Sequence, residues 1–160
     1  MELTEKEALL RLTSLCSQAE HCSYEMEEKM RKWGLTTEER AGIMKYLTDN
    51  KFIDDRRFAR VFAIDKIRYN KWGGRKVDQA MWAKHIDEHI RRETLADIDE
   101  EEYMAVLRPL IKSKRKGIKA ASIYEMNTKL IRFALGRGFS MQQIKKCLDG
   151  DMPEDCGDDL

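Results

Sequence analysis

Apolar residues recur three and four positions apart along most of this chain, which is the spacing of one face of an α-helix. Residues 103–111 show this pattern without a break. Thr4, Thr36 and Ser140 each stand three positions before a Glu or Gln, as in a capping box at the start of a helix. The pattern predicts short helices along the whole chain, among them helices near residues 5–19, 54–70, 75–85 and 119–135.

One short motif occurs three times, at residues 34–36, 85–87 and 138–140, with intervals of 51 and 53 residues. It consists of Gly or His, an apolar residue and a helix-capping residue. Repetition near 50 residues is typical of stacked helical modules that bury their apolar faces against one another. We predict an all-α fold, a tandem array of three three-helix, helix-turn-helix-like repeats that is elongated and curved. The expected segments are three repeats at 1–50, 51–98 and 99–148 and an acidic tail at 149–160.

Composition agrees with helices and excludes some classes of protein. Only 2 of 160 residues are Pro and 37% are charged, which favours helices with much exposed surface over sheets. The first residues lack the segments of a secretory signal and no run of 18 apolar residues occurs, so we expect a cytoplasmic protein with no membrane partner. Cys16, Cys22, Cys147 and Cys156 do not have the spacing of a zinc site. We expect ordinary reduced thiols, no metal and no cofactor.

Charge is distributed very unevenly, although the net charge is only +1. Residues 112–148 hold 10 basic residues and one acidic residue, a net charge of +9, whereas residues 149–160 hold 6 acidic residues and no basic one. Helical surfaces that are merely solvated usually mix both signs. The segregation predicts an anionic partner, either a phosphate backbone or an acidic protein groove, and binding that weakens with salt.

The candidate binding residues are cations of the second and third repeats. In the second repeat we select Arg68, Lys71, Arg75, Lys76, Lys84, Arg91 and Arg92. In the third repeat we select Lys112, Lys114, Arg115, Lys116, Lys119, Arg132 and Arg137. A second interpretation applies to residues 112–119, because cations at the C-terminal end of a helix also complement its free carbonyl groups. We expect the acidic tail to be disordered and able to fold back over the basic surface as a brake on binding.

Candidates for catalysis are few. Asp54 and Asp55 form an acidic pair that could hold a divalent metal for cleavage chemistry, but their place at the start of a helix favours capping. No Ser, Cys or His is placed as a nucleophile with its base, and no phosphate-binding loop motif occurs. Residues 73–76, Gly-Gly-Arg-Lys, could wrap a phosphate or form a plain turn between helices. We expect no enzymatic activity.

Three aromatic residues lie among the basic ones. Tyr69, Trp72 and Trp82 could stack on unpaired nucleobases, or they could belong to the apolar core, which is the commoner role at helical spacing. We assign Trp82 to the core, on the same helix side as Val77 and Met81. Both roles stay open for Trp72, which lies in a predicted loop.

A set of short segments carries a resemblance to a known family. The segments are residues 32–35, Lys-Trp-Gly-Leu; 47–55, Leu-Thr-Asp-Asn-Lys-Phe-Ile-Asp-Asp; 56–60, Arg-Arg-Phe-Ala-Arg; the basic stretch after Gly73 and Gly74; and 136–139, Gly-Arg-Gly-Phe, with Ile144. Together they resemble the RecX family of bacterial recombinase regulators, over about residues 5–148. His85 departs from the family, which commonly has Gly at this turn, where a positive φ is less favourable for a side chain. The acidic tail is a second departure.

The resemblance implies tandem three-helix modules that form a curved protein in the groove of a RecA filament assembled on single-stranded DNA. It also implies that the protein limits filament growth and the recombination, ATPase and co-protease activities of RecA. We therefore favour a monomeric, non-enzymatic regulator whose partner is the RecA filament, with single-stranded DNA as a further partner. The alternative is a stand-alone helical nucleic-acid-binding protein that acts without RecA.

Overall fold

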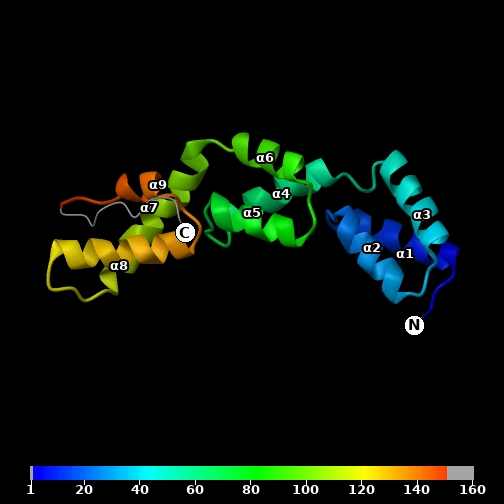
Figure 1. The fold of residues 1–160 in the computed structure, drawn as a ribbon, viewed down its shortest axis with the longest axis horizontal. Helices are drawn as coiled ribbons and strands as arrows, with labels where there is room; N and C mark the ends of the chain where they lie inside the picture. The colour runs from blue at the N-terminus through cyan, green and yellow to red at the C-terminus, as the bar shows by residue number, and fades with distance from the viewer. Residues whose placement is uncertain (1, 151–160) are drawn as a thin grey trace. The chain divides into compact units, whose positions relative to one another are not determined.

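The fold is all-helical throughout residues 2–150, the part of the chain that this computed structural model describes (Figure 1). The helices are α1 (Glu5–Gln18), α2 (Ser23–Lys32), α3 (Thr37–Asp49), α4 (Asp55–Arg68), α5 (Gly74–Ala83), α6 (Glu88–Ala96), α7 (Glu100–Lys116), α8 (Ile123–Gly136) and α9 (Met141–Lys145). The all-α prediction is confirmed. Of the predicted acidic tail, residues 151–160 lie outside the described range. Within residues 2–150, no helix combines the length and the apolar character needed to cross a membrane.

Contacts divide the chain into two compact units. Unit one holds the residues up to Phe62 together with Met81–Thr94, and unit two holds Ala63–Ala80 together with the residues from Leu95 onward. Helices α4, α5 and α6 therefore contribute residues to both units. The borders of the three expected repeats remain a prediction.

The same turn follows α2, α5 and α8. Its central residue has a positive φ, 79° at Gly34, 58° at His85 and 96° at Gly138. In each turn the amide of the next, apolar residue donates to the carbonyl oxygen five positions earlier, at 3.2, 3.1 and 3.2 Å, as in a Schellman motif. The capping residue that follows then accepts from an amide of the next helix in all three turns. The motif that recurs in the sequence thus recurs in the structure, as expected for a helical repeat array.

The middle turn accommodates a histidine because the side chain has a partner. The imidazole ring of His85 stacks on the ring of Tyr24, with ring centroids 4.0 Å apart and 9° between the ring planes. A positive φ is less favourable for His than for Gly. A stacked aromatic pair stabilises the folded state by about 0.5–1.5 kcal/mol, which offsets the cost of the positive φ. The departure from Gly is therefore offset by a contact inside unit one.

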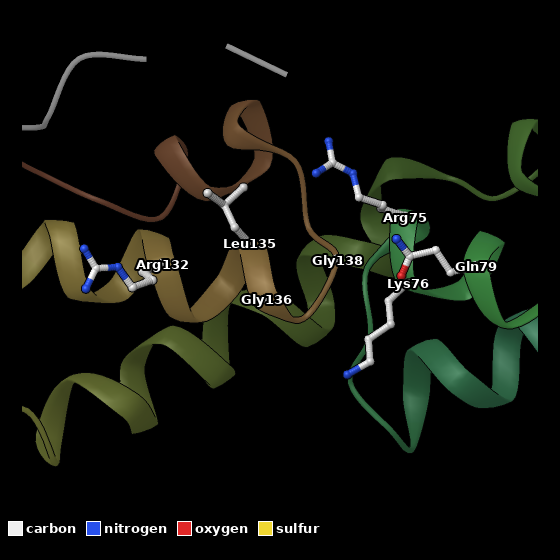
Figure 2. Close-up of a pocket in the computed structure, with 7 residues that line it drawn as sticks. All are labelled: Arg75, Lys76, Gln79, Arg132, Leu135, Gly136 and Gly138. Atoms are coloured by element: carbon white, nitrogen blue, oxygen red, sulfur yellow. The ribbon is translucent and has the colours of Figure 1, made fainter. Parts of the chain in front are cut away.

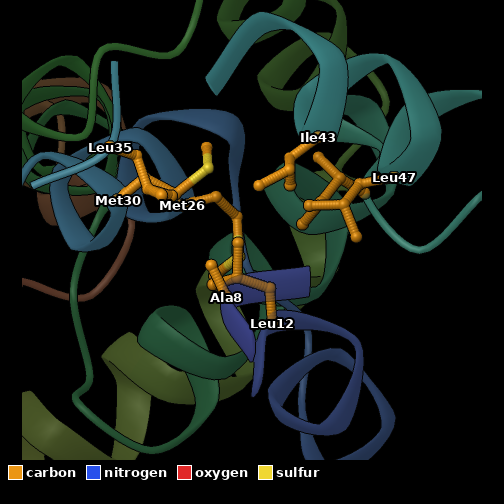
Figure 3. Close-up of a cluster of buried hydrophobic side chains, with 8 residues drawn as sticks. Ala8, Leu12, Met26, Met30, Leu35, Ile43 and Leu47 are labelled. Carbon is orange, nitrogen blue, oxygen red and sulfur yellow. The ribbon is translucent and has the colours of Figure 1, made fainter. Parts of the chain in front are cut away.

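The core of unit one lies between α1, α2 and α3 (Figure 3). Its buried side chains are Ala8, Leu12, Met26, Met30, Leu35, Ile43, Leu47 and Ile53. Each helix contributes a pair of residues four positions apart, so one stripe of each helix faces inward. Burial of a side chain of the size of Leu or Met contributes about 1.5–3 kcal/mol, which is why this stripe determines how the three helices pack.

Cys22 precedes α2 and its side chain is fully buried. The thiol donates a weak hydrogen bond to the carbonyl oxygen of Lys84, with 3.9 Å between sulfur and oxygen. Burial raises the pKa of the Cys22 thiol to about 11. The group is therefore protonated at neutral pH, and a protonated, buried thiol is neither a nucleophile nor a metal ligand.

Glu25 connects the start of α2 to the turn after α5. Its carboxylate accepts hydrogen bonds from the amide of Cys22 at 3.0 Å and from Nζ of Lys84 at 3.1 Å. Burial alone would raise the pKa of Glu25, but these two donors and the nearby His21 outweigh burial and hold the pKa below its usual range. The fold of unit one therefore favours the ionised form of this side chain.

In unit two, α8 packs against both α7 and α9 (Figure 1). The buried apolar side chains in this part of the unit are Tyr103, Met104, Leu107, Ile111, Leu130, Ile131, Ala134, Phe139, Met141, Ile144 and Leu148. Tyr103, Leu107 and Ile111 from α7 fall on the stripe that the spacing of residues 103–111 predicts, and Met104 extends this stripe. This core holds the C-terminal end of α7, where the basic residues are concentrated, against α8.

Two glycines bring the loop before α5 into direct backbone contact with the turn after α8. The amide of Gly73 donates to the carbonyl oxygen of Arg137 at 2.8 Å, and the amide of Arg75 donates to that of Gly138 at 3.2 Å. A Cβ added at Gly73 would overlap the carbonyl group of Gly138 and the amide nitrogen of Phe139. Residues 73–76 therefore form a contact between helices within unit two. The amides of Gly73 and Arg75 already donate to carbonyl oxygens, so they are not available to bind a phosphate.

The assignment of Trp82 to the core is wrong, because 68% of this residue is exposed. Val77 and Met81 are fully buried, and successive helical residues are separated by about 100°. Trp82 is therefore turned by about 140° from Val77, beyond the buried stripe of α5. The sequence analysis placed Val77, Met81 and Trp82 on one face of the helix, but only Val77 and Met81 lie on the buried face.

We expect Gly73→Ala to destabilise the protein by about 1–3 kcal/mol, because the added methyl group overlaps backbone atoms that cannot rotate away. The measurement is urea unfolding followed by circular dichroism. Gly136→Ala is the matched control, since a Cβ added there meets no heavy atom within 4 Å. The control should change stability by less than about 1 kcal/mol. Equal unfolding midpoints for the two variants would contradict the proposed role of the contact.

We expect Glu25→Gln to lower the free energy of unfolding by about 1 kcal/mol at neutral pH, because it removes the charge that faces Lys84. A carboxylate whose pKa is lowered in the folded state stabilises the protein above its unfolded pKa and loses this effect as the pH falls through the folded pKa. The difference between Glu25→Gln and the unsubstituted protein should therefore shrink below about pH 4. Glu28→Gln, on the exposed side of the same helix, should have little effect at any pH.

Candidate anion-binding surface

Unit two contains eleven of the fourteen cations selected from the sequence, and unit one contains Lys84, Arg91 and Arg92. The contacts of these cations separate them into two groups. One group is held by carboxylates or carbonyl oxygens of the fold, and the other has no ion pair among residues 2–150. The second group is the better candidate for an external anion, because its charge is not compensated nearby.

Four residues selected in the expected second repeat have partners within the fold. Arg68 makes two hydrogen bonds to the carboxylate of Glu102, at 2.8 and 3.2 Å, and Glu102 raises the pKa of Arg68. Lys84 binds Glu25, as described above, and Arg92 binds Glu88 one turn earlier on α6 at 2.9 Å. The fourth residue, Arg91, donates to the carbonyl oxygen of Ile86 at 2.8 Å. These four side chains are engaged in holding helices and turns together.

Two lysines flank the indole ring of Trp72. Nζ of Lys76 lies 4.9 Å from the ring centroid, and Nζ of Lys66 lies 5.4 Å from it. Both distances are within the range of cation–π interaction, which contributes about 0.5–1 kcal/mol at exposed sites. Lys71, exposed and with a positive φ of 58°, directly precedes Trp72. The role of Trp72 that the sequence left open is thus partly answered, because the ring positions two cations.

Phe133 on α8 brings together a cation near the end of α7 and the residue that caps the end of α8. Nζ of Lys114, near the end of α7, lies 4.8 Å from the ring centroid, and Cζ of Arg137 lies 5.4 Å from it. Arg137 also donates from Nη1 to the carbonyl oxygen of Asn70 at 3.1 Å, two residues before Trp72. The two aromatic rings with their four cations therefore belong to one connected set, the basic–aromatic cluster: Lys66, Trp72, Lys76, Lys114, Phe133 and Arg137.

A cavity of about 360 Å³ lies beside the cluster (Figure 2). It is lined by Arg75, Lys76, Gln79, Arg132, Leu135, Gly136 and Gly138. Figure 2 shows Arg75 and Lys76 leaving α5 in different directions, and Arg132 and Leu135 projecting from α8. Three cations and no carboxylate line this cavity, so it has the charge to accept an anionic group.

The end of α7 carries the highest density of positive charge. Lys112, Lys114, Arg115 and Lys116 are exposed there, and Lys119 is exposed in the loop that follows. None of the five makes an ion pair within residues 2–150. Three of them, Lys114, Arg115 and Lys116, lie in the last helical turn, where they also face the negative end of the helix dipole. We call Lys112, Lys114, Arg115, Lys116 and Lys119 the α7 tip.

The structure joins some of the predicted residues and leaves others apart. Lys114 and Arg137 meet at the ring of Phe133, and Lys76 lies against the ring of Trp72. The hydrogen bond from Arg137 to the carbonyl oxygen of Asn70 links these two places. Sequence reasoning missed two members of the cluster, Lys66 and Phe133. The spacing of Phe133 and Arg137 on consecutive helical turns was a usable signal, since residues four apart share a helix face. No sequence signal connected Lys66 with Lys76.

Asp54 and Asp55 act as helix caps. Asp54 accepts hydrogen bonds from the amides of Arg56 and Arg57, at 3.0 and 3.1 Å. Asp55 accepts from the amide of Ser23 at 2.8 Å and so satisfies a free amide at the start of α2. Both carboxylates are therefore occupied by backbone donors. In residues 2–150 there is also no group of three His, Cys, Asp or Glu side chains that could hold a metal ion.

Two family models match this chain, and both describe RecX domains. The model of the second three-helix domain matches residues 54–95, and the model of the third three-helix domain matches residues 100–148. The two matches together cover more than half of the 160 residues.

Curated relatives carry the name regulatory protein RecX. The protein from Chlorobium limicola is 28% identical over 147 residues, which are 91% of this chain and 89% of that protein. The protein from Vibrio vulnificus is 24% identical over 140 residues, which are 86% of this chain and 88% of that protein. The protein from Lactobacillus johnsonii is longer: 25% identity extends over 119 residues, 74% of this chain but only 44% of that protein.

Solved structures agree in fold. The crystal structure of RecX from Lactobacillus salivarius superimposes with a TM-score of 0.79, covering 89% of this chain and 93% of that one, at 17% sequence identity. A second crystal structure, of a regulatory protein RecX, gives a TM-score of 0.80 with 89% of this chain and 72% of that one covered, also at 17% identity. At such identities the likeness shows the fold alone.

We expect the combined variant Lys114→Ala, Arg115→Ala and Lys116→Ala to bind a polyanion at least about tenfold more weakly, because three uncompensated charges are lost. The measurement is a titration of fluorescent oligothymidylate at several salt concentrations. The slope of log affinity against log salt should become less steep by about 2, which is about 0.7 for each lost contact with a single strand.

The matched control removes Lys29, Arg31 and Lys32, which occupy the last turn of α2. The same number of charges leaves the same part of a helix, so any loss of helix-dipole stabilisation is equal. This control should bind oligothymidylate like the unsubstituted protein. Equal losses of affinity in both variants would show a general effect of net charge and contradict a specific role of the α7 tip.

Proposed function

This chain belongs to the RecX family, and from that premise we propose that it regulates the RecA recombinase. It binds in the groove of a RecA filament assembled on single-stranded DNA and restrains filament growth, recombination, ATP hydrolysis and co-protease activity. The observation that carries the proposal is the match of two consecutive RecX domain models to residues 54–95 and 100–148. The name regulatory protein shared by the relatives supports a role in control rather than in catalysis.

The basic surface of unit two suits such a partner. A nucleoprotein filament presents phosphates and acidic side chains, and both are attracted to uncompensated cations. The α7 tip and the basic–aromatic cluster are joined by the contact of Lys114 with Phe133, so a partner could engage both in one encounter. We propose that these two features, with Arg75 and Arg132 at the cavity, form the surface that contacts the filament.

A mechanism without catalysis agrees with the chemistry of the described residues. Asp54 and Asp55 are used as caps, and the buried Cys22 is protonated. The protein acts by occupying a surface, and its effect on ATP hydrolysis follows from holding RecA subunits in one arrangement. We propose that it does so in the cytoplasm, where RecA works, and as a monomer.

A stand-alone nucleic-acid-binding protein is the alternative function. The observation in its favour is the basic–aromatic cluster, since aromatic rings beside cations are typical of sites for single strands. In this cluster, however, the faces or edges of Trp72 and Phe133 already have lysine and arginine neighbours within 5.4 Å. Stacking of a base would have to displace these cations, so the cluster favours contact with phosphates or carboxylates over readout of bases.

The test compares bare single-stranded DNA with the same DNA coated by RecA. The full chain is titrated onto each at near-physiological salt in the presence of ATP, while DNA-bound fluorescence and ATP hydrolysis are followed. We expect binding to the RecA filament at least about tenfold tighter than to bare DNA, which is about 1.4 kcal/mol. ATP hydrolysis should fall as the filament becomes saturated.

Two controls make this result specific. The α7-tip variant should lose inhibition of ATP hydrolysis, and the matched variant of α2 should retain it. Equal affinity for bare and coated DNA, with hydrolysis unchanged, would contradict regulation of RecA and favour the stand-alone alternative.

A further inference from the structure

A second cavity of unit two lies where the described part of the chain ends. It has a volume of about 470 Å³ and is lined by Arg115, Ala120, Ala121, Ser122, Ile123, Met126, Asn127 and Asp149. Apart from Arg115 and Asp149, the lining is apolar or uncharged. The residues come from the end of α7, the loop after it, the start of α8 and the chain after α9.

The chain after α9 is fixed against this cavity by two contacts. Nδ2 of Asn127, a residue only 2% exposed, donates to the carbonyl oxygen of Asp149 at 2.8 Å. Gly150 has a positive φ of 80°, and a Cβ added there would lie 2.7 Å from Cγ2 of Ile123. Whatever follows Gly150 therefore leaves the fold directly beside the start of α8 and the α7 tip.

The surface next to this exit point combines apolar groups with cations. Ile123 is 61% exposed and Tyr124 is 50% exposed, which is unusual for large apolar residues at the start of a core helix. Arg115, Lys116 and Lys119 belong to the α7 tip and have no ion pair within the described residues. The surface would be complemented by a segment that carries a few apolar residues followed by several carboxylates.

Residues 151–160 have this composition. The sequence Asp-Met-Pro-Glu-Asp-Cys-Gly-Asp-Asp-Leu places Met152 and Pro153 directly after Asp151, followed by Glu154 and Asp155, and it contains no basic residue. Three residues span at most about 11 Å, so Pro153 is within reach of the cavity from Gly150. The carboxylates that follow would then lie near the α7 tip.

We propose that residues 151–160 bind the cavity and the α7 tip of their own chain, with Met152 and Pro153 against the apolar lining and the acidic residues against Arg115, Lys116 and Lys119. The segment thereby competes with the anionic partner of the α7 tip, a consequence that rests on the proposed function. The reaction is intramolecular, so the effective concentration of the segment is on the order of millimolar and weak contacts are enough to occupy the surface. Salt weakens this contact as it weakens binding of any external anion.

The test of docking uses the full chain without RecA or DNA. A nitroxide is attached to Cys156 after Cys16→Ser and Cys147→Ser, while the fully buried Cys22 is left in place. We expect paramagnetic broadening of the amide signals of residues 115–126 that falls at least about twofold between low and high salt. The same fall should follow when the tail is made neutral at Asp151, Glu154, Asp155, Asp158 and Asp159, by Asn or Gln. Broadening that is equal in the native and neutral tails would overturn the proposal.

The test of competition measures binding of oligothymidylate to the full chain. The neutral-tail variant should bind about three- to tenfold more tightly than the native chain at low salt, and the difference should shrink at high salt. The matched control neutralises five exposed acidic residues that make no described ion pair: Glu2, Glu5, Glu38, Asp97 and Glu101. It produces the same net charge and should change affinity by less than about twofold. Equal gains in both variants would show a general charge effect and overturn competition by the tail.

Because the nitroxide experiment contains no RecA, failure of the proposed function would leave its result unchanged.

Discussion

The backbone contact between Gly73 and Gly138 is the constraint on which the basic surface of unit two depends. Two hydrogen bonds fix the loop before α5 to the turn after α8, at a separation that leaves no room for a methyl group at residue 73. This places Arg75 and Lys76 opposite Arg132, and it sets Arg137 beside Asn70. The cations meet because the main chains meet first. Side-chain attraction alone could not gather them, since like charges repel at these distances.

The cations of the chain have two roles that charge counting does not separate. Arg68, Lys84 and Arg92 are paired with carboxylates, so they contribute to the fold more than to an external field. The α7 tip is uncompensated among residues 2–150 and projects a field into solvent. Aromatic rings order further cations, because Trp72 holds Lys76 and Phe133 holds Lys114 of the α7 tip in place without neutralising them. Positional order and retained charge are both needed for recognition of a polyanion.

Features that depend on residues close together in the sequence could be predicted from the sequence alone. The turns at Gly34, His85 and Gly138 were found because a Schellman motif involves only about six consecutive residues. The concentration of charge at the end of α7 was found for the same reason. Features that join distant segments were not found: the pairing of Arg68 with Glu102 spans 34 residues, and that of Lys114 with Phe133 spans two helices. The error at Trp82 has a local cause, since this residue lies about 140° around α5 from the buried Val77 and therefore outside the buried stripe.

The burial of Cys22 gives unit one a natural reporter of its own opening. With a pKa of about 11, only about one thiol in ten thousand is ionised at neutral pH, and the sulfur has no exposed surface. A disulfide reagent can therefore modify Cys22 only during the moments when α2 separates from its neighbours. The rate of that modification, compared with the rate for the partly buried Cys16, measures how often the core between α1, α2 and α3 opens in the native protein.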